Sequence, residues 1–166
     1  VYTLVDIYGI KQILNVTDKK SAHCPQSNQN YTYDGRGFLE TITDGEGNVT
    51  HYERNDRGLV TNLKRGLGWE DGVGSTLLDR WEAHEISTEW YEDFDIPKLM
   101  TFRGKEFEKP WQDFKRIEYK HDSYGHVTEE SVTDLTQITQ PYVTAGRNRT
   151  TSFIYNYFDN SPVVST

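Results

Sequence analysis

The chain has 166 residues, which is long enough for one domain with a hydrophobic core and too short for two. Its 26 acidic and 18 basic residues give a net charge of −8 without any Lys/Arg cluster, which argues against nucleic acid or an anionic membrane as a partner. There is no signal peptide and no apolar run of transmembrane length, so we expect a soluble chain that carries no targeting signal of its own. The single cysteine leaves the redox compartment open.

The first thirty residues predict one hairpin and a loop. Residues 1–5 and 10–16 are rich in β-formers and flank an Asp6-x-x-Gly9 turn. Residues 17–30 carry Lys, Ser, Asn and Gln without periodicity, so we expect a connecting loop there.

The next stretch contains one short pattern twice in succession. The pattern Tyr31-x-Tyr33-Asp34-x-x-Gly37 returns as Tyr52-x-Arg54-Asn55-x-x-Gly58. Each position recurs after 21 residues, a period that indicates stacked supersecondary units. A further turn, Asp44-x-x-Gly47, lies between the two copies.

The chemistry of these turns explains their spacing. An Asp or Asn at the first position can accept hydrogen bonds from the backbone two residues on, and a Gly at the fourth position adopts positive φ without a Cβ clash. Residues 38–43 and 48–54 between the turns are rich in Thr, Val, Ile and Tyr, which fit a pleated sheet. The repeating unit is therefore predicted as strand, turn, strand, turn.

The second half of the chain continues the strands less regularly. Residues 63–84, with Gly66-x-Gly68 and Gly72-x-Gly74, are expected to form an irregular Gly-rich excursion. The pattern of residues 77–90 fits a short helix or a strand, and we favour a strand from Glu85.

Beyond this ambiguous segment the predicted elements are short and separated by loops. Residues 99–102 and 150–157 predict strands, and residues 103–113 and 135–149 predict loops. The clearest hairpin joins residues 116–121 to 126–133 through Asp122-x-x-Gly125, with Tyr119 in the repeat's tyrosine position.

No motif predicts a catalytic, metal or cofactor site. The histidines at 23, 51, 84, 121 and 126 lack metal-ligand spacing, and no nucleophile elbow, Walker loop or dinucleotide fingerprint is present. We therefore expect no metal, no cofactor and no enzymatic activity. An enzyme would require His84 or His126 to converge with carboxylates in a pocket.

The aromatic content has two interpretations. The eleven Tyr, seven Phe and four Trp can pair across strands and hold the sheet in register, which their recurrence at repeat positions favours. Alternatively, an exposed aromatic face could bind carbohydrate or protein, as in a cell-surface recognition module. A contiguous exposed patch of Trp69, Trp81, Trp90 or Trp111 would support the second interpretation.

The linked turns of residues 31–52 resemble the YD repeat of Rhs-family proteins, the bacterial polymorphic-toxin shells related to Tc-toxin cocoons and teneurins. Residues 21–25 and 88–97 also resemble segments of Rhs cores. The resemblance implies an all-β fold in which successive antiparallel β-hairpins form a strip of a β-spiral shell. It also implies that residues 1–166 form a single repeat region, a fragment of a larger structural shell that is secreted or at the cell surface and encloses a C-terminal toxin domain.

The expected partners follow from the same resemblance. They are the neighbouring repeats of the shell and the enclosed toxin, and open strand edges could also form a homodimer. Rhs proteins often self-cleave at an Asp-Pro motif, but this chain contains no Asp-Pro pair, so that activity is not carried over. The positions expected to fix turns and register are Tyr31, Tyr33, Asp34, Gly37, Asp44, Gly47, Tyr52, Asn55, Gly58, Tyr119, Asp122 and Gly125.

Overall fold

The computed structural model describes residues 1–17, 28–70, 76–106, 108–136, 147–156 and 161–165. Residues 18–27 of the predicted loop, with the Rhs-like motif at residues 21–25, therefore lie outside the described residues. The loop is shorter than predicted, because Thr17 and residues 28–30 are strand residues. The strands are β1 (Tyr2–Ile7), β2 (Ile10–Thr17), β3 (Asn28–Tyr33), β4 (Leu39–Thr43), β5 (Val49–Arg54), β6 (Val60–Trp69), β7 (Leu77–Trp90), β8 (Pro97–Gly104), β9 (Gln112–His121), β10 (Val127–Asp134), β11 (Asn148–Asn156) and β12 (Ser161–Ser165).

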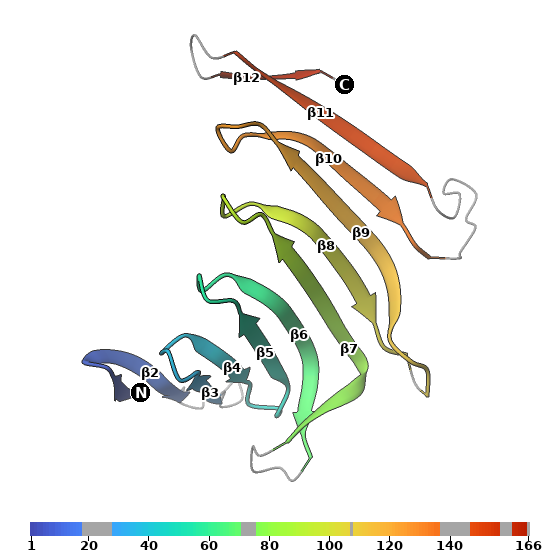
Figure 1. The fold of residues 1–166 in the computed structure, drawn as a ribbon. Coiled ribbons are helices and arrows are strands. Elements are labelled where there is room, and N and C mark those ends of the chain that lie inside the picture. Colours follow the sequence, from blue (N-terminus) through green and yellow to red (C-terminus); the bar gives the residue numbers. More distant parts are fainter. Residues whose placement is uncertain (18–27, 71–75, 107, 137–146, 157–160, 166) are drawn as a thin grey trace, which may run out of the picture. The chain divides into compact units, whose positions relative to one another are not determined.

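Each strand neighbours the next strand of the chain in one open sheet, in the order β1 to β12 (Figure 1). The pairs described in register detail, such as β3 with β4 and β9 with β10, are antiparallel. Antiparallel neighbours need only short turns, which the Asp/Asn-x-x-Gly spacing supplies. The expected all-β strip of successive antiparallel hairpins is thus confirmed.

The chain divides into two compact units. The first contains residues 1–85 and 105–109, and the second contains residues 86–104 and 110–166. Strands β1 to β6 belong to the first unit, and β9 to β12 belong to the second. That residues 1–166 form one repeat region stays a prediction.

The expected irregular excursion at residues 63–84 is wrong over most of its length, because β6 extends to Trp69 and β7 begins at Leu77. The glycines there allow close approach instead of breaking the sheet. A Cβ on Gly66, whose φ is 71°, would lie 3.2 Å from the carbonyl oxygen of Glu82, and a Cβ on Gly68 would lie 2.6 Å from Nε of Arg80. Glycine thus lets β7 pack tightly against β6.

Further strand boundaries differ from the prediction. The strand expected from Glu85 begins eight residues earlier, at Leu77, so the helical interpretation of this segment is wrong. The predicted loop at 103–113 is shorter, because β8 continues to Gly104 and β9 begins at Gln112. Tertiary pairing here extends strands into sequence that carries charges and was assigned to a loop.

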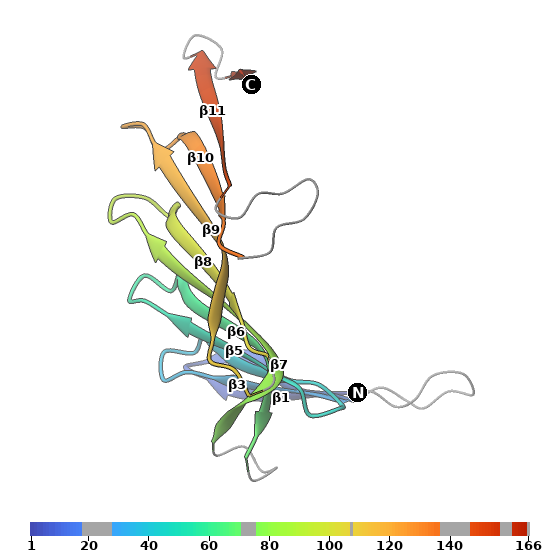
Figure 2. The same cartoon turned by 90° about the vertical axis from the view of Figure 1, so that its right-hand side faces the viewer.

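Few side chains are buried in either unit. Among the described residues the buried hydrophobic side chains are Val49, Leu67 and Ala83, and Val49 pairs with Leu67 across β5 and β6. Figure 2 shows the strands of each unit as one layer, and no described helix or second sheet covers them. A sheet of one layer leaves both faces open, which explains why so little is buried. No helix among the described residues has the length and apolar character needed to cross a membrane.

Candidate functional site

The Asp34 turn joins β3 to β4 and shows how the repeat's chemistry builds a tight reversal. The Asp34 N–H donates to the carbonyl of Phe38 (2.8 Å), and the Gly37 N–H donates to the carbonyl of Asp34 (2.9 Å). The Asp34 Oδ1 accepts from the N–H groups of Arg36 and Phe38, both at 2.9 Å. One side-chain oxygen therefore satisfies two backbone donors that the turn leaves unpaired.

The same bonds recur in three other turns. In each, the side-chain Oδ1 of the first residue accepts from the backbone N–H groups two and four residues later, at distances from 2.8 to 3.0 Å. The first residues of these turns are Asp44, Asn55 and Asp122. Asn55 makes the same bonds as the aspartates because its amide also carries an acceptor oxygen.

The fourth residue of each turn is a glycine in the left-handed region. Gly37, Gly47, Gly58 and Gly125 have φ values of 86°, 78°, 80° and 86°. An L-residue with a Cβ is strained at these values, so glycine is the residue that the turn accepts at least cost.

Asp34 and Asp44 have pKa values below the ordinary value of an aspartate. Burial alone would raise the pKa of Asp44, but hydrogen bonds from the side chain and N–H of Asn48 and from the Glu46 N–H outweigh it, and Arg80 adds an attractive charge. Burial also opposes the shift at Asp34, where the N–H groups of Phe38 and Arg36 and the Arg36 guanidinium hold the pKa below its ordinary value. Both turns therefore stabilise the ionised aspartate.

In the first unit an aromatic ring covers the glycine of the next hairpin. Figure 1 shows the β3–β4 and β5–β6 turns side by side, and Phe38, the residue after Gly37, reaches from one to the other. A Cβ built on Gly58 would lie 2.8 Å from Cζ of Phe38. The guanidinium groups of Arg36 and Arg54 lie 5.3 and 5.7 Å from the centre of the Phe38 ring. The ring thus fills the space that the missing side chain of Gly58 leaves.

Arg36 makes a second link between the same two turns. Its Nη1 donates to the carbonyl of Asn55 (2.7 Å) and its Nη2 to the carbonyl of Arg54 (3.2 Å), while its Nε and Nη2 bond Asp34 Oδ2. Charge-assisted bonds of this kind are stronger than neutral ones. Consecutive hairpins are therefore joined at their turns as well as along their strands.

The second unit has a matching contact. A Cβ on Gly125 would lie 2.8 Å from Cδ1 of Phe94, which comes from the turn between β7 and β8. The ring of His121 packs edge-on against Phe94 and Tyr91, with centroid separations of 4.8 and 4.1 Å. The Tyr91 hydroxyl donates to the carbonyl of Tyr119 (2.7 Å). These three rings link the turn between β7 and β8 to the turn between β9 and β10.

The turn at the other end of β4 and β5 uses an arginine in place of a ring. Arg80 of β7 lies over Gly68 and donates to the side-chain oxygen of Asn48 and to the carbonyl of Gly47 (3.2 Å). A Cβ on Gly47 would meet only the Nη2 of Arg80, at 3.9 Å. The glycine of this turn is thus open where Gly58 is covered.

The first hairpin differs from the others. Both Tyr8 (φ 54°) and Gly9 (φ 82°) lie in the left-handed region, so this is a two-residue turn between Ile7 and Ile10, with Asp6 Oδ1 accepting from the Gly9 N–H (2.9 Å). Positive φ at both central residues characterises the tight hairpin turn whose twist matches the strands. The Tyr8 hydroxyl donates to the carbonyl of Gly35, which lies in the turn between β3 and β4.

The repeat tyrosines lie in strands near the turns, and they make different contacts. Tyr33 donates its hydroxyl proton to the carbonyl of Ile13 (2.6 Å), and Tyr31 donates to the side chain of Gln29 (2.7 Å). Tyr52 packs under the guanidinium of Arg54 at 5.7 Å. Burial and then the adjacent Glu130 carboxylate raise the pKa of Tyr119.

The histidines and tryptophans considered for other functions are divided between the two units. No group of three His, Cys, Asp or Glu side chains in the part of the chain that the structure describes could hold a metal ion. His84 lies in the first unit and His126 in the second, where His126 Nδ1 lies 3.2 Å from Asp122 Oδ2. Trp69, Trp90 and Trp111 are half-buried, and the side chain of Trp81 lies outside the description.

The sequence pattern marks the first and fourth residues of the Asp34, Asp44, Asn55 and Asp122 turns, and it does not mark the residues that link these turns. Phe38 and Arg36 occupy positions that the repeat pattern leaves unspecified. A large ring directly after the turn glycine, as in Gly37-Phe38, is the sequence feature that could have indicated a link between turns.

Comparison with known proteins relates the chain to one fold. No protein-family model and no curated protein sequence matches it. Among solved structures, it is similar to a chain in the crystal structure of TcdB2-TccC3-Cdc42, with a TM-score of 0.56 and 15% sequence identity. The similarity covers 98% of this chain and 8% of that chain, so this chain spans a small part of its structural neighbour. The chain has a distant Rhs- and Tc-toxin-like β fold.

Proposed function

We propose that the chain is a structural segment of an Rhs-type encapsulating shell and has no catalytic activity of its own. In this proposal the shell belongs to a secreted bacterial polymorphic toxin and encloses its C-terminal toxin domain. The observation that carries the proposal is the open sheet of hairpins, joined by repeated Asp/Asn-x-x-Gly turns, in which almost no described hydrophobic side chain is buried.

The physical argument is that such a sheet needs neighbours. A domain normally stabilises itself by packing two layers around a core, and the described residues of each unit form one layer. In repeat proteins each unit buries its surface against the next, and the end strands require caps. The YD-like turns and the Rhs- and Tc-toxin-like fold support preceding and following repeats as those neighbours.

The alternative is a cell-surface module that binds carbohydrate or protein through an aromatic face. It would require exposed rings gathered in one place. The described tryptophans are half-buried, and Trp69 Nε1 donates to Thr43 Oγ1 (3.3 Å) within the sheet. We therefore prefer the structural role.

Size-exclusion chromatography with light scattering, run beside circular dichroism, tests the proposal. We expect a β-rich chain that self-associates through its strand edges. Leu4→Lys, on the exposed first strand, should weaken the association because charged side chains on an edge oppose strand pairing. Ser152→Lys is the control, since Ser152 is exposed on β11 and pairs with Glu129 of β10 on one side and with Ser165 of β12 on the other.

A heat-resistant β-rich monomer would contradict the proposal. It would mean that the edges are covered, and it would favour a self-contained binding domain.

A further inference from the structure

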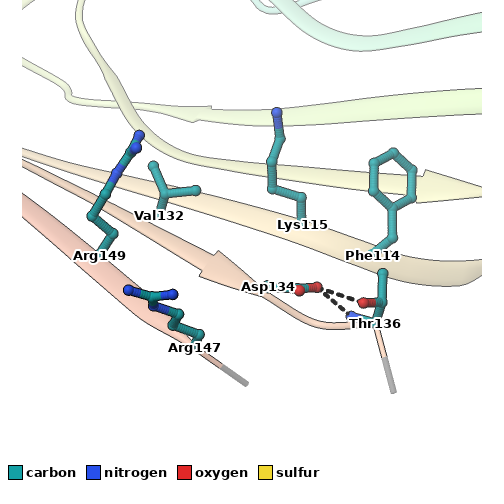
Figure 3. A pocket seen from close by; sticks show the side chains of 7 residues that line it. All are labelled: Phe114, Lys115, Val132, Asp134, Thr136, Arg147 and Arg149. Atoms are coloured by element: carbon teal, nitrogen blue, oxygen red, sulfur yellow. Dashed lines mark hydrogen bonds between the residues drawn. The ribbon is translucent and has the colours of Figure 1, made fainter. Parts of the chain in front are cut away.

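Strands β9, β10 and β11 of the second unit carry an open pocket of about 560 Å³ (Figure 3). Three cationic side chains line it, namely Lys115, Arg147 and Arg149. Phe114 and Val132 add apolar surface. A volume of this size is in the range of ligand-binding pockets.

The strand register brings the cations together. Asp134 of β10 lies opposite Lys115 of β9, and its N–H donates to the carbonyl of Arg147 (3.0 Å). Two residues earlier on β10, Val132 lies opposite Arg149 of β11. Since alternate residues of a strand face the same side, these two cross-strand rows share one face of the sheet.

A β-bulge adds Phe114 to the same face. Phe102 of β8 pairs with Lys115, and Arg103 pairs with Asp113, so Phe114 is the extra residue of β9. A bulge redirects side chains that would otherwise alternate between faces. Figure 3 shows the Phe114 ring and Lys115 rising from the same side of the ribbon, and Lys115 Nζ lies 3.9 Å from the centre of the Phe102 ring.

The lining residues carry more positive than negative charge. Asp134 is the one carboxylate among the lining residues, and its Oδ1 already accepts from the N–H (2.8 Å) and Oγ1 (2.7 Å) of Thr136. Arg149 is exposed, and its side chain makes no hydrogen bond or ion pair with any residue that the structure describes. This excess of cations stands out in a chain of net charge −8.

We propose that this pocket binds an acidic polypeptide segment in which Asp or Glu side chains alternate with apolar ones. The guanidinium of Arg149 offers paired donors that match a carboxylate, and Lys115 and Arg147 supply further positive charge. Phe114 and Val132 give the apolar neighbours of those carboxylates a surface to pack on. The net negative charge of the chain disfavours a nucleic acid, whose phosphates require an extended basic surface. The inference does not rest on the proposed shell role.

Fluorescence anisotropy with a labelled peptide of alternating Glu and Leu/Phe residues tests the proposal on the 166-residue chain. We expect saturable binding that weakens with added salt. Arg149→Gln should weaken it about tenfold, because a charge-assisted hydrogen bond to a carboxylate is lost. Lys11→Gln, which removes an exposed positive charge in the first unit, is the matched control and should leave binding unchanged.

Two altered peptides and a second variant separate the contribution of charge to binding from the contribution of apolar contact. Replacing every Glu of the peptide by Gln should abolish binding, and replacing Leu and Phe by Ser should weaken it, as should Phe114→Ala. Circular dichroism checks that each variant keeps its β content. The proposal is overturned if no acidic peptide binds, if Arg149→Gln and Lys11→Gln have equal effects, or if a single-stranded oligonucleotide binds as tightly as the peptide.

Discussion

Gly58 and Gly47 hold the same place in the same kind of turn, and their φ values of 80° and 78° are nearly equal. Their surroundings differ. The ring of Phe38 fills the space beside Gly58, whereas a Cβ on Gly47 would find only the end of Arg80, at 3.9 Å. The comparison separates two demands on a turn glycine. The local backbone requires positive φ at both positions, and packing against the neighbouring hairpin requires the absence of a side chain only at Gly58.

The largest expected effect is at the covered glycines. Gly58→Ala should lower the free energy of unfolding by about 2 to 4 kcal/mol, because it adds both backbone strain and a Cβ that would lie 2.8 Å from Phe38. Gly125→Ala should behave alike, since its Cβ would lie 2.8 Å from the Phe94 ring. Urea unfolding followed by circular dichroism measures both. If the loss of unfolding free energy at Gly58 and Gly125 were no larger than the loss at Gly47, the distinction between covered and open glycines would be contradicted.

A smaller effect is expected at the open glycine. Gly47→Ala should cost about 1 to 2 kcal/mol, the strain of a Cβ in the left-handed region alone. Gly35→Ala is the control in the same kind of turn, because Gly35 has no positive φ and no atom within 4 Å of its added Cβ. It should change the free energy of unfolding by less than about 0.5 kcal/mol in the same urea titration. A large loss at Gly35 would show that the turns tolerate no added side chain.

The smallest effect concerns pH. The folded-state pKa of Asp44 lies below its ordinary value of 3.8, so its contribution to stability is present above pH 3.8 and is lost as the pH falls through the folded-state pKa. Asp44→Asn should reduce this acid dependence while keeping the acceptor oxygen, as Asn55 does naturally. Urea midpoints measured against pH compare the two proteins. Identical pH profiles would contradict a role for the Asp44 carboxylate.

The Asp/Asn-x-x-Gly turns can be found in the sequence because their chemistry is local. An Asp or Asn side chain bonding the backbone two and four residues later needs no tertiary context, and a glycine three residues along marks positive φ. The same logic failed at residues 63–84, where Gly66 and Gly68 serve close approach between β6 and β7. The sequence alone does not show whether a glycine forms part of a turn or allows an adjacent strand to approach closely.

The links between hairpins could not be predicted because they depend on register across strands that are distant in sequence. Phe38 packs beside Gly58 only when two hairpins align, and Arg149 and Lys115 line the same pocket only because β9, β10 and β11 pair in this register. The bulge at Phe114 shifts the alternation of side chains by one residue. No local pattern in a single sequence marks such a shift.

The most direct test of the link between hairpins is a double-mutant cycle on Phe38 and Gly58. Unfolding free energies are measured for the wild-type chain, Phe38→Ala, Gly58→Ala and the double variant. If the ring and the missing side chain share one space, Gly58→Ala will cost less by roughly 1 kcal/mol or more when Phe38 is alanine, because the added Cβ then meets no ring. An equal cost in both backgrounds would contradict the account and leave turn geometry as the whole reason for the glycine.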